Sequence, residues 1–179
     1  MKTQIRMRGF SLLEVMVALI VVSVGMLGIA KMHALAFAST GSASMRSLAA
    51  IEAASLASMM RANRGYWAAG AAPPVITITG TTISDATLAG TAATVTYCMK
   101  GANTPCSPAT LAAYDLHRWA AALNAILPTP SATVSCPVIA PPISCTIQIN
   151  WVEKTVAINA QAANGPAMQA PTYVLYVEP

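Results

Sequence analysis

The sequence has few charged residues. Only 9% of its 179 residues are Asp, Glu, Lys or Arg, against roughly 25% in an average soluble protein. Such low charge excludes a disordered acidic or basic tail protein and a highly charged repeat protein. The formal net charge of +4 is also unevenly placed, because Lys2, Arg6 and Arg8 lie in the first eight positions and the remainder is close to neutral. The basic balance therefore belongs to the N-terminus and gives no firm evidence for nucleic-acid binding.

The sequence also lacks the usual signatures of catalysis and of cofactor binding. It contains no phosphate-binding P-loop, no dinucleotide-binding glycine motif and no metal-ligand box,. Asp115 and His117 are close in sequence, but positions two apart on a helix face different directions, and no glycine-framed serine accompanies them. We therefore expect no enzyme activity, no cofactor and no metal. The sequence shows no internal repeat that would indicate a solenoid,.

Proline is absent before position 73, and the chain has one long apolar run. From Phe10 to Ala30 the only charged residue is Glu14. A helix of this length spans ~31 Å, close to the hydrocarbon thickness of a bilayer. The basic residues before it place the N-terminus in the cytoplasm. The prolines between 128 and 142 forbid a second such helix, so we expect one transmembrane helix over residues 10–31, in the inner membrane.

An ordinary secretory signal peptide is the alternative for this N-terminus. Such a peptide has an apolar region of roughly 7–15 residues followed by a small-residue cleavage site. The run found here is longer, and a carboxylate inside it is costly unless it has a function. Glu14 is therefore the informative residue of the segment.

Residues 8–19, RGFSLLEVMVAL, closely resemble the class III signal of type IV pilins and their relatives. The resemblance implies that a prepilin peptidase cleaves between Gly9 and Phe10 and that the new Phe10 amino terminus is N-methylated. Residues 1–9 would then be a cleaved leader. In this family the glutamate at the position of Glu14 is thought to pair with the amino terminus of a neighbouring subunit, which would set the axial stagger of the filament. Partners would be the prepilin peptidase, other minor and major pilins along the N-terminal helix, and membrane lipid.

Three further patches resemble minor pilins of the PilV type: residues 21–30, 59–65 and 113–119. This likeness implies a minor pilin that takes part in type IV pilus assembly, within a priming or tip complex. A minor pseudopilin of a type II secretion system is the alternative, because its N-terminus is nearly the same. The head would lie in the periplasm and then on the pilus at the cell surface.

Beyond the membrane the pattern predicts an amphipathic helix over residues 32–64 and a head over residues 65–179. The apolar side of this helix would carry Met45, Leu48, Ile51, Leu56 and Met59, and Gly65 would cap its end in the left-handed conformation,. Glu52 falls within that side; it either pairs with a residue of the head or lies at the rim, and we place it at the rim. Tyr66 and Trp67 would fill the junction with the head. We expect an α+β fold, a long N-terminal helix packed on an antiparallel sheet, which is also the pilin fold.

Hydrophobic alternation and capping residues predict the elements of the head. Ser107 and Pro108 form a good start for a helix that Pro128 ends. Its buried stripe would contain Leu111, Trp119, Leu123 and Ile126. The sheet would have about four to six strands, including residues 75–79, 93–98, 143–151, 156–158 and 173–177,.

All four cysteines lie in the head, and their even number on the oxidising side of the membrane favours disulfides. Three pairings are possible. We expect Cys98–Cys106, which closes a loop, and Cys136–Cys145, which bridges two strands. Gaps of this length do not match the spacing of zinc ligands,.

Overall fold

The protein was analysed as a computed structural model, which describes residues 11–90, 98, 106–137, 142–154 and 168–179. The chain forms two compact units, residues 1–40 and residues 41–179. The first unit contains the beginning of the long helix α1 (Leu12–Ala62), and the second contains the end of that helix together with the head. The predicted end of the helix near Ala62 is confirmed.

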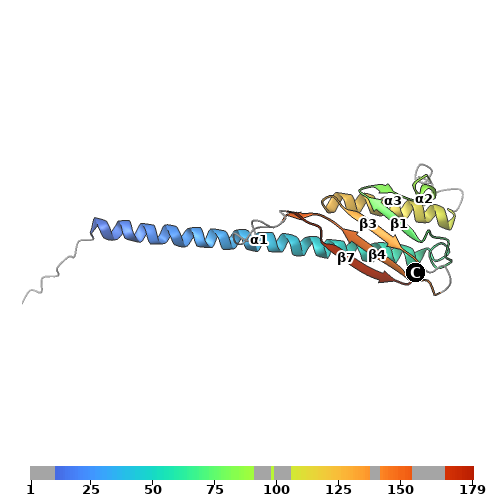
Figure 1. The fold of residues 1–179 in the computed structure, drawn as a ribbon, viewed down its shortest axis with the longest axis horizontal. Coiled ribbons are helices and arrows are strands. Elements are labelled where there is room, and N and C mark those ends of the chain that lie inside the picture. Colours follow the sequence, from blue (N-terminus) through green and yellow to red (C-terminus); the bar gives the residue numbers. More distant parts are fainter. Residues whose placement is uncertain (1–10, 91–97, 99–105, 138–141, 155–167) are drawn as a thin grey trace, which may run out of the picture. The chain divides into compact units, whose positions relative to one another are not determined.

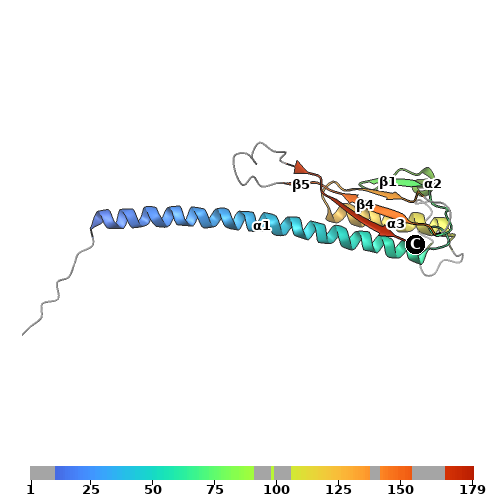
Figure 2. The same cartoon turned by 60° about the horizontal axis from the view of Figure 1, so that its bottom comes forward.

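The second unit is built around a five-stranded antiparallel sheet (Figure 1). Its spatial order is β2-β1-β3-β4-β7. The strands are β1 (Val75–Thr79), β2 (Thr82–Ile83), β3 (Ser131–Ser135), β4 (Cys145–Asn150) and β7 (Thr172–Val177). Figure 2 shows that α3 (Pro108–Ile126) and the end of α1 cover the same face of this sheet. The predicted α+β architecture, a long helix packed on an antiparallel sheet, is confirmed.

The covered face of the sheet is apolar, and the other face is polar and uncharged over β3 and β4. Side chains that alternate along the strands point into the core, among them Ile76, Ile78, Val134, Ile147 and Ile149, each 0% exposed. Between them lie Ser, Thr, Gln and Asn residues of β3 and β4, which the register aligns in rows across the sheet. A period of two with one buried face is what an antiparallel sheet requires when helices cover only one side.

Strand β3 is central in the sheet, although sequence analysis did not predict it. It pairs with β1 on one side and with β4 on the other. Its sequence, SATVS, contains only one large apolar residue, Val134. Strands β1, β4 and β7 confirm the strands expected at residues 75–79, 143–151 and 173–177. The observed β4 is shorter at both ends, Cys145–Asn150, and β7 begins one residue earlier, at Thr172.

Three smaller elements complete the described head. They are the helix α2 (Ala86–Gly90) and the strands β5 (Glu153–Lys154) and β6 (Met168–Gln169), which pair with each other. The expected strand over residues 156–158 lies outside the described residues. So does the expected strand over residues 93–98, apart from Cys98.

The end of α1 packs in the head through one face that combines alanines with two larger apolar residues. Its buried side chains are Ala49, Ala53, Leu56, Ala57 and Met60. The prediction was wrong for Ile51, which is 62% exposed. Residues 49, 53, 56, 57 and 60 follow the i, i+4, i+7 spacing of one helix face, and this face is buried against the head. Ile51 lies outside that face.

The chain leaves α1 through a set of turns that an interaction with α3 holds in place. Asn63 is 5% exposed, and its Nδ2 donates a 2.7 Å hydrogen bond to the carbonyl oxygen of Pro108. The expectation that Gly65 caps the helix in the left-handed conformation was wrong, because positive φ occurs later, at Gly70. A Cβ atom on Gly65 would lie 3.3 Å from the ring of Pro108, so close packing favours a small residue there. Tyr66 and Trp67 are buried, as predicted.

Helix α3 begins where the sequence predicted. The Ser107 side chain caps the helix by accepting a hydrogen bond from the Thr110 N–H, and Pro108 occupies the first turn,. Trp119 and Leu123 are fully buried as expected. Ile126 is 38% exposed, which corrects its assignment to the buried stripe, and Leu116 is buried instead. The buried face continues from Leu123 to Leu127, which is 3% exposed, so Ile126 lies at the margin of that face.

Both expected disulfides are present, Cys98–Cys106 and Cys136–Cys145. The second joins Cys136, the residue after β3, to Cys145, the first residue of β4, next to the last register pair, Ser135 with Thr146. The Cα atoms of the two cysteines are 4.2 Å apart, a distance typical of a narrow antiparallel pair. Both cysteines are buried, so this disulfide is part of the hydrophobic core.

Removal of the Cys136–Cys145 bond is expected to lower the stability of the head. A double Cys136→Ala, Cys145→Ala variant of the full chain should lose about 2–4 kcal/mol of unfolding free energy, because the unfolded chain regains the entropy that the bond removes. Denaturant titration followed by circular dichroism measures the change. The Cys98→Ala, Cys106→Ala variant tests the entropic cause, because its bond spans a sequence separation of 8 against 9 and its removal should cost about the same,. Equal unfolding midpoints for wild type and the Cys136, Cys145 variant would contradict the prediction.

Candidate functional site

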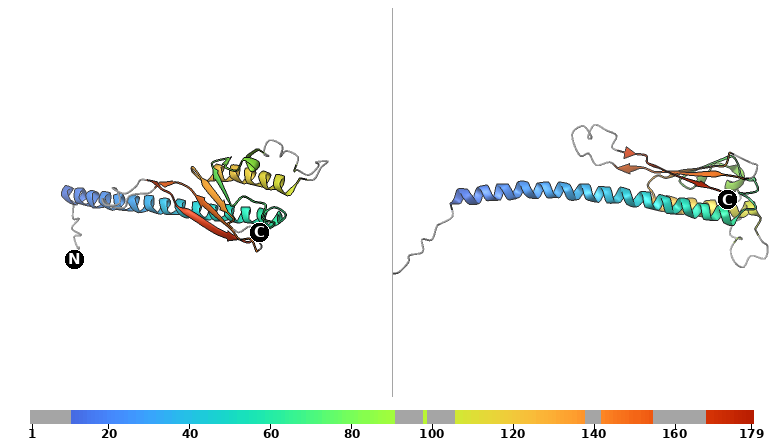
Figure 3. Two further views of the ribbon diagram at one scale, coloured as in Figure 1. Left: turned by 45° about the vertical axis from the view of Figure 1, so that its right-hand side comes forward. Right: turned by 90° about the horizontal axis from the view of Figure 1, so that it is seen from below.

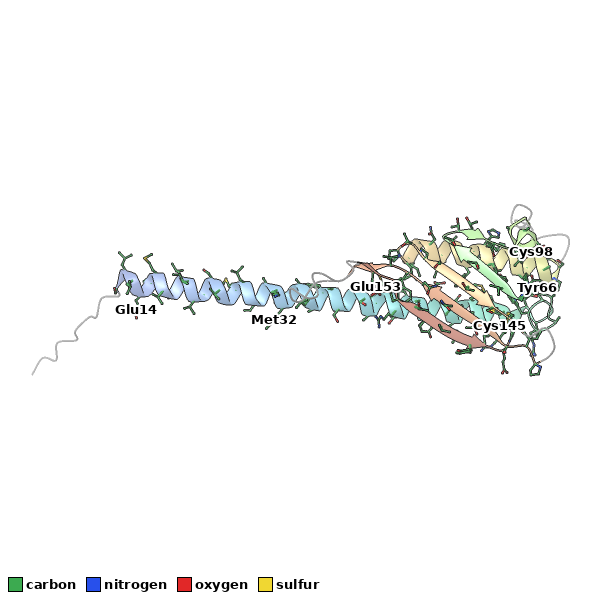
Figure 4. The ribbon with its side chains drawn as sticks, in the orientation of Figure 1. Glu14, Met32, Tyr66, Cys98, Cys145 and Glu153 are labelled. Atoms are coloured by element: carbon green, nitrogen blue, oxygen red, sulfur yellow. A yellow bond between two sulfur atoms is a disulfide. The ribbon has the colours of Figure 1, made fainter. Side chains whose placement is uncertain are left out.

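The first unit presents an apolar helix that no described part of the chain covers. Residues 12–40 are helical, and an 18-residue window within α1 has a mean hydropathy of 2.5 with none of it buried. Side chains project from all sides of this segment (Figure 4). The large apolar residues Leu12, Met32 and Phe37 are 81%, 72% and 77% exposed. A helix that is apolar on every side requires lipid or other helices around it. By length and composition this is a helix that can cross a membrane.

Glu14 lies in the first turn of this helix (Figure 4). The carbonyl oxygen of Ser11 accepts hydrogen bonds from the N–H groups of Glu14 and Val15, at 3.0 and 3.3 Å. The unpaired N–H groups of a helix start carry partial positive charge, which stabilises a carboxylate in this position. The Glu14 side chain is exposed, and no residue of the described chain forms an ion pair with it. Gly9 and Phe10, the residues of the expected cleavage and methylation, lie outside the described residues.

A second group of charged side chains lies in the head, in a cleft between the end of α1 and α3. The cleft has a volume of about 260 Å³, and its lining includes Glu52, Tyr114, Asp115 and Arg118. Arg118 Nη1 donates a 3.1 Å hydrogen bond to the Tyr114 hydroxyl, and its guanidinium carbon lies 5.5 Å from the centre of that ring. Glu52 is half-buried at the margin of the cleft, in agreement with its predicted rim position.

Burial shifts the pKa of both carboxylates in the cleft. It raises the pKa of Glu52 and that of Asp115, because the charged forms lose hydration,. The positive charge of Arg118 partly opposes the rise in the pKa of Asp115. The cleft therefore carries two carboxylates and one cation that stacks on an aromatic ring.

Replacement of Asp115 by asparagine is expected to stabilise the head at neutral pH. Because the pKa of Asp115 is raised in the folded state, the folded chain binds its proton more tightly than the unfolded chain, and the charged form costs stability above the folded pKa. Asp115→Asn removes that cost. The melting temperature of the variant should exceed that of wild type at pH 7, and the difference should vanish as the pH falls through the folded pKa towards the unfolded value. A difference that does not change with pH would contradict this account.

The structure keeps Asp115 and His117 apart. Asp115 lines the cleft beside α1, whereas His117 Nε2 lies 3.2 Å from the carbonyl oxygen of Leu88 on α2. The two side chains therefore interact with different elements and do not form an acid–base pair. In the described ranges no three metal-ligating side chains come together.

One buried carboxylate was not singled out by the sequence. Glu153 is 9% exposed, and each of its oxygens accepts a hydrogen bond of 2.8 Å, one from Trp151 Nε1 and one from Ser42 Oγ. These bonds connect β5 to the beginning of the second unit at Ser42. The spacing of Trp151 and Glu153 carries no recognisable signal, because their contact depends on where the chain turns after β4.

Comparison with known protein families identifies the N-terminal segment. Residues 5–30 match the model of the prokaryotic N-terminal methylation motif. The motif, the apolar helix and the head together indicate a protein of the pilin or pseudopilin type, and they support a type IV pilin-like protein. Neither the curated proteins nor the solved structures gave a match to this chain.

The motif also carries consequences for processing and location. It implies cleavage by a prepilin peptidase and interactions between pilin-type subunits. Together with the uncovered apolar helix it indicates that the protein is anchored in a membrane.

Proposed function

We propose that this chain is a minor pilin that takes part in type IV pilus assembly. A prepilin peptidase would cleave between Gly9 and Phe10, and the Phe10 amino group would be methylated. The mature subunit would join other minor pilins in a priming or tip complex, and it would contact major pilins through its N-terminal helix. The observation that carries the proposal is the methylation motif at residues 5–30, placed on a helix whose apolar side chains remain uncovered.

Glu14 would have a specific part in this assembly. A carboxylate within an apolar helix is costly in lipid and far less costly beside a cation. The mature Phe10 amino group of a neighbouring subunit is such a cation. Pairing would then favour the axial offset at which both charges meet.

The proposed orientation places the N-terminus in the cytoplasm and the head in the periplasm, before extraction into a surface pilus. The positive residues Lys2, Arg6 and Arg8 support it, because positive charge is retained on the cytoplasmic side. The disulfides Cys98–Cys106 and Cys136–Cys145 support it as well, since such bonds persist in oxidising compartments,. We propose no enzyme activity for the head, which would act as a structural and docking module.

The PilV type is the subtype that we propose, on the likeness of residues 21–30, 59–65 and 113–119 to such minor pilins. Deletion of the gene in its native host tests this assignment against a minor pseudopilin. We expect fewer surface filaments in the sheared fraction, restored by the wild-type gene, with protein secretion unchanged. Normal filaments together with a loss of secretion would contradict the proposal and favour a type II secretion pseudopilus.

A further inference from the structure

The cleft between the end of α1 and α3 carries a net negative charge. Of the charged side chains that line it, Glu52 and Asp115 are negative and Arg118 is positive, which leaves a net charge of −1. Burial raises the pKa of both carboxylates, so a further cation beside them would be favoured,. The Arg118 guanidinium lies over the Tyr114 ring and donates to its hydroxyl, which holds this cation beside α3. We call this cleft the acidic flank of the head.

A cavity on the other side of α1 carries the opposite net charge. It has a volume of about 410 Å³, and among the charged side chains that line it Arg61 and Arg64 are positive and Glu178 is negative, which leaves a net charge of +1. Both arginines are exposed. Arg61 is nine residues after Glu52, which is about two and a half turns of an α-helix, so the two side chains leave α1 in opposite directions,. We call this cavity the basic flank.

The two flanks lie at different heights along α1. Helix α3 lies beside the end of α1 and runs antiparallel to it (Figure 3, right). The hydrogen bonds that fix this direction join Asn63 to Pro108 and Glu52 to Trp119. Each helix advances eleven residues between these two bonds, so Asp115 lies about level with residue 56 of α1. At about 1.5 Å per residue, Arg61 is therefore about 8 Å beyond Asp115 towards the C-terminal end of α1.

A parallel neighbour displaced along the helix axis would bring the two flanks level. This step rests on the proposed function, in which chains anchored in one membrane are parallel and Glu14 pairs with the Phe10 amino group of the neighbour ahead. That pair displaces the neighbour by four residues of helix, about 6 Å. Two identical parallel chains keep the same displacement at every height. Asp115 of the chain ahead then lies about 2 Å, measured along the axis, from Arg61 of the chain behind.

We propose that the acidic flank binds the basic flank of a second copy of this chain, so that Arg61 of the copy behind enters the cleft between Glu52 and Asp115 of the copy ahead. The net charges of the two flanks are equal and opposite, which favours this pairing. The contact also joins two different surfaces, so every copy can bind one neighbour ahead and another behind. A repeated contact of this kind extends an open filament rather than closing a dimer. Arg61 and Glu14 of one chain would thus contact the same neighbour.

The contact gives a role to a charge that costs the head stability. Asp115→Asn should raise the melting temperature at pH 7, as argued above, because a half-buried charge is removed,. The same change should lower the amount of the chain in filaments relative to membranes several-fold, since the arginine of the second copy loses a carboxylate partner. An Asp115 that served only the structure of the head would not produce these opposite effects.

Zero-length crosslinking in cells that assemble filaments tests the contact directly. One tagged full-length chain carries Arg61→Lys and Asp115→Asn, and a second chain with another tag is wild type at both positions. A carbodiimide couples an amine to a carboxylate that touches it, so a link from position 61 of the first chain to Asp115 must join two copies. Mass spectrometry of the sheared filaments should detect this link. In the matched control, Arg46→Lys replaces Arg61→Lys at an exposed arginine about 22 Å away along α1, and the link should be about tenfold weaker,.

Charge exchange provides a second test that does not depend on the crosslinker. Arg61→Asp should lower the filament-to-membrane ratio of the chain about tenfold, and adding Asp115→Arg should restore it. The proposal is overturned, and the proposed function stands, if filaments contain the chain without the link, if positions 46 and 61 link equally, or if position 61 links only to other proteins. A link in membranes of cells whose filaments lack the chain would support the contact and overturn the proposed function. No link in either fraction, or a normal ratio for Arg61→Asp, overturns the contact.

Discussion

A Glu14→Ala chain is expected to be made, anchored and cleaved like wild type, yet to be nearly absent from assembled filaments. Leaving one member of a desolvated ion pair without its partner costs on the order of 3–5 kcal/mol, and each 1.4 kcal/mol corresponds to about a tenfold change in an equilibrium constant. Incorporation should therefore fall by about a hundredfold or more. Quantitative immunoblots of the sheared filament fraction and of the membrane fraction measure this ratio.

Two variants separate the charge of Glu14 from the presence of any polar group in the helix. Glu14→Gln keeps the size of the side chain and removes its charge, so it should behave as Glu14→Ala does. Ser23→Ala is the matched control, because the Ser23 hydroxyl already donates to the Leu19 carbonyl oxygen of its own helix at 2.7 Å. Its incorporation should equal that of wild type. If Glu14→Gln enters filaments normally, the pairing of Glu14 with a neighbouring amino terminus is excluded.

The second large effect is expected at Trp119. This side chain is 1% exposed within the core, and its Nε1 donates a 2.9 Å hydrogen bond to the Glu52 carbonyl oxygen of α1. It therefore joins α3 to α1 both by packing and by a polar contact. Trp119→Ala should lower the unfolding free energy by about 3–5 kcal/mol, the range observed when a large buried aromatic residue is removed. Against a total stability of about 5–15 kcal/mol for a typical domain, this is a large fraction.

Trp119→Phe distinguishes packing from the hydrogen bond. It retains an aromatic ring in the same place and loses the indole N–H, so its cost should be clearly smaller than that of the alanine variant. Denaturant unfolding of the full chain in detergent, followed by circular dichroism, gives both values. A cost below about 1 kcal/mol for Trp119→Ala, within the range of an ordinary surface substitution, would contradict the role assigned to Trp119.

Local signals in the sequence were sufficient for most of the individual elements. Neighbouring residues alone determine the Ser107–Pro108 start of α3, the end of α1 and the alternation in β1, β4 and β7. All of these features were predicted. The cysteine pairs were also expected because each joins residues that are close in sequence. The errors at Ile51 and Ile126 concern which side of the helix faces the core, because both residues lie between buried neighbours along the chain.

Features that depend on distant contacts were not predicted. Strand β3 is rich in serine and threonine, and its central place follows from pairing with β1 and β4 rather than from its own pattern. The cleft between Glu52 and Asp115 requires α1 and α3 to be adjacent, and the bond between Ser42 and Glu153 joins residues 111 positions apart. The N-terminal motif was the opposite case, because the residues that define it are contiguous. Family comparison therefore found the same segment that the sequence had indicated.

Mass spectrometry of the N-terminal peptide, from protein extracted from the membranes of its native host, tests the central claim most directly. The account predicts that the mature chain begins at Phe10, contains 170 of the 179 residues, and carries one added methyl group on its terminal amine. A chain that retains Met1, or one that begins beyond Ala30, would contradict it.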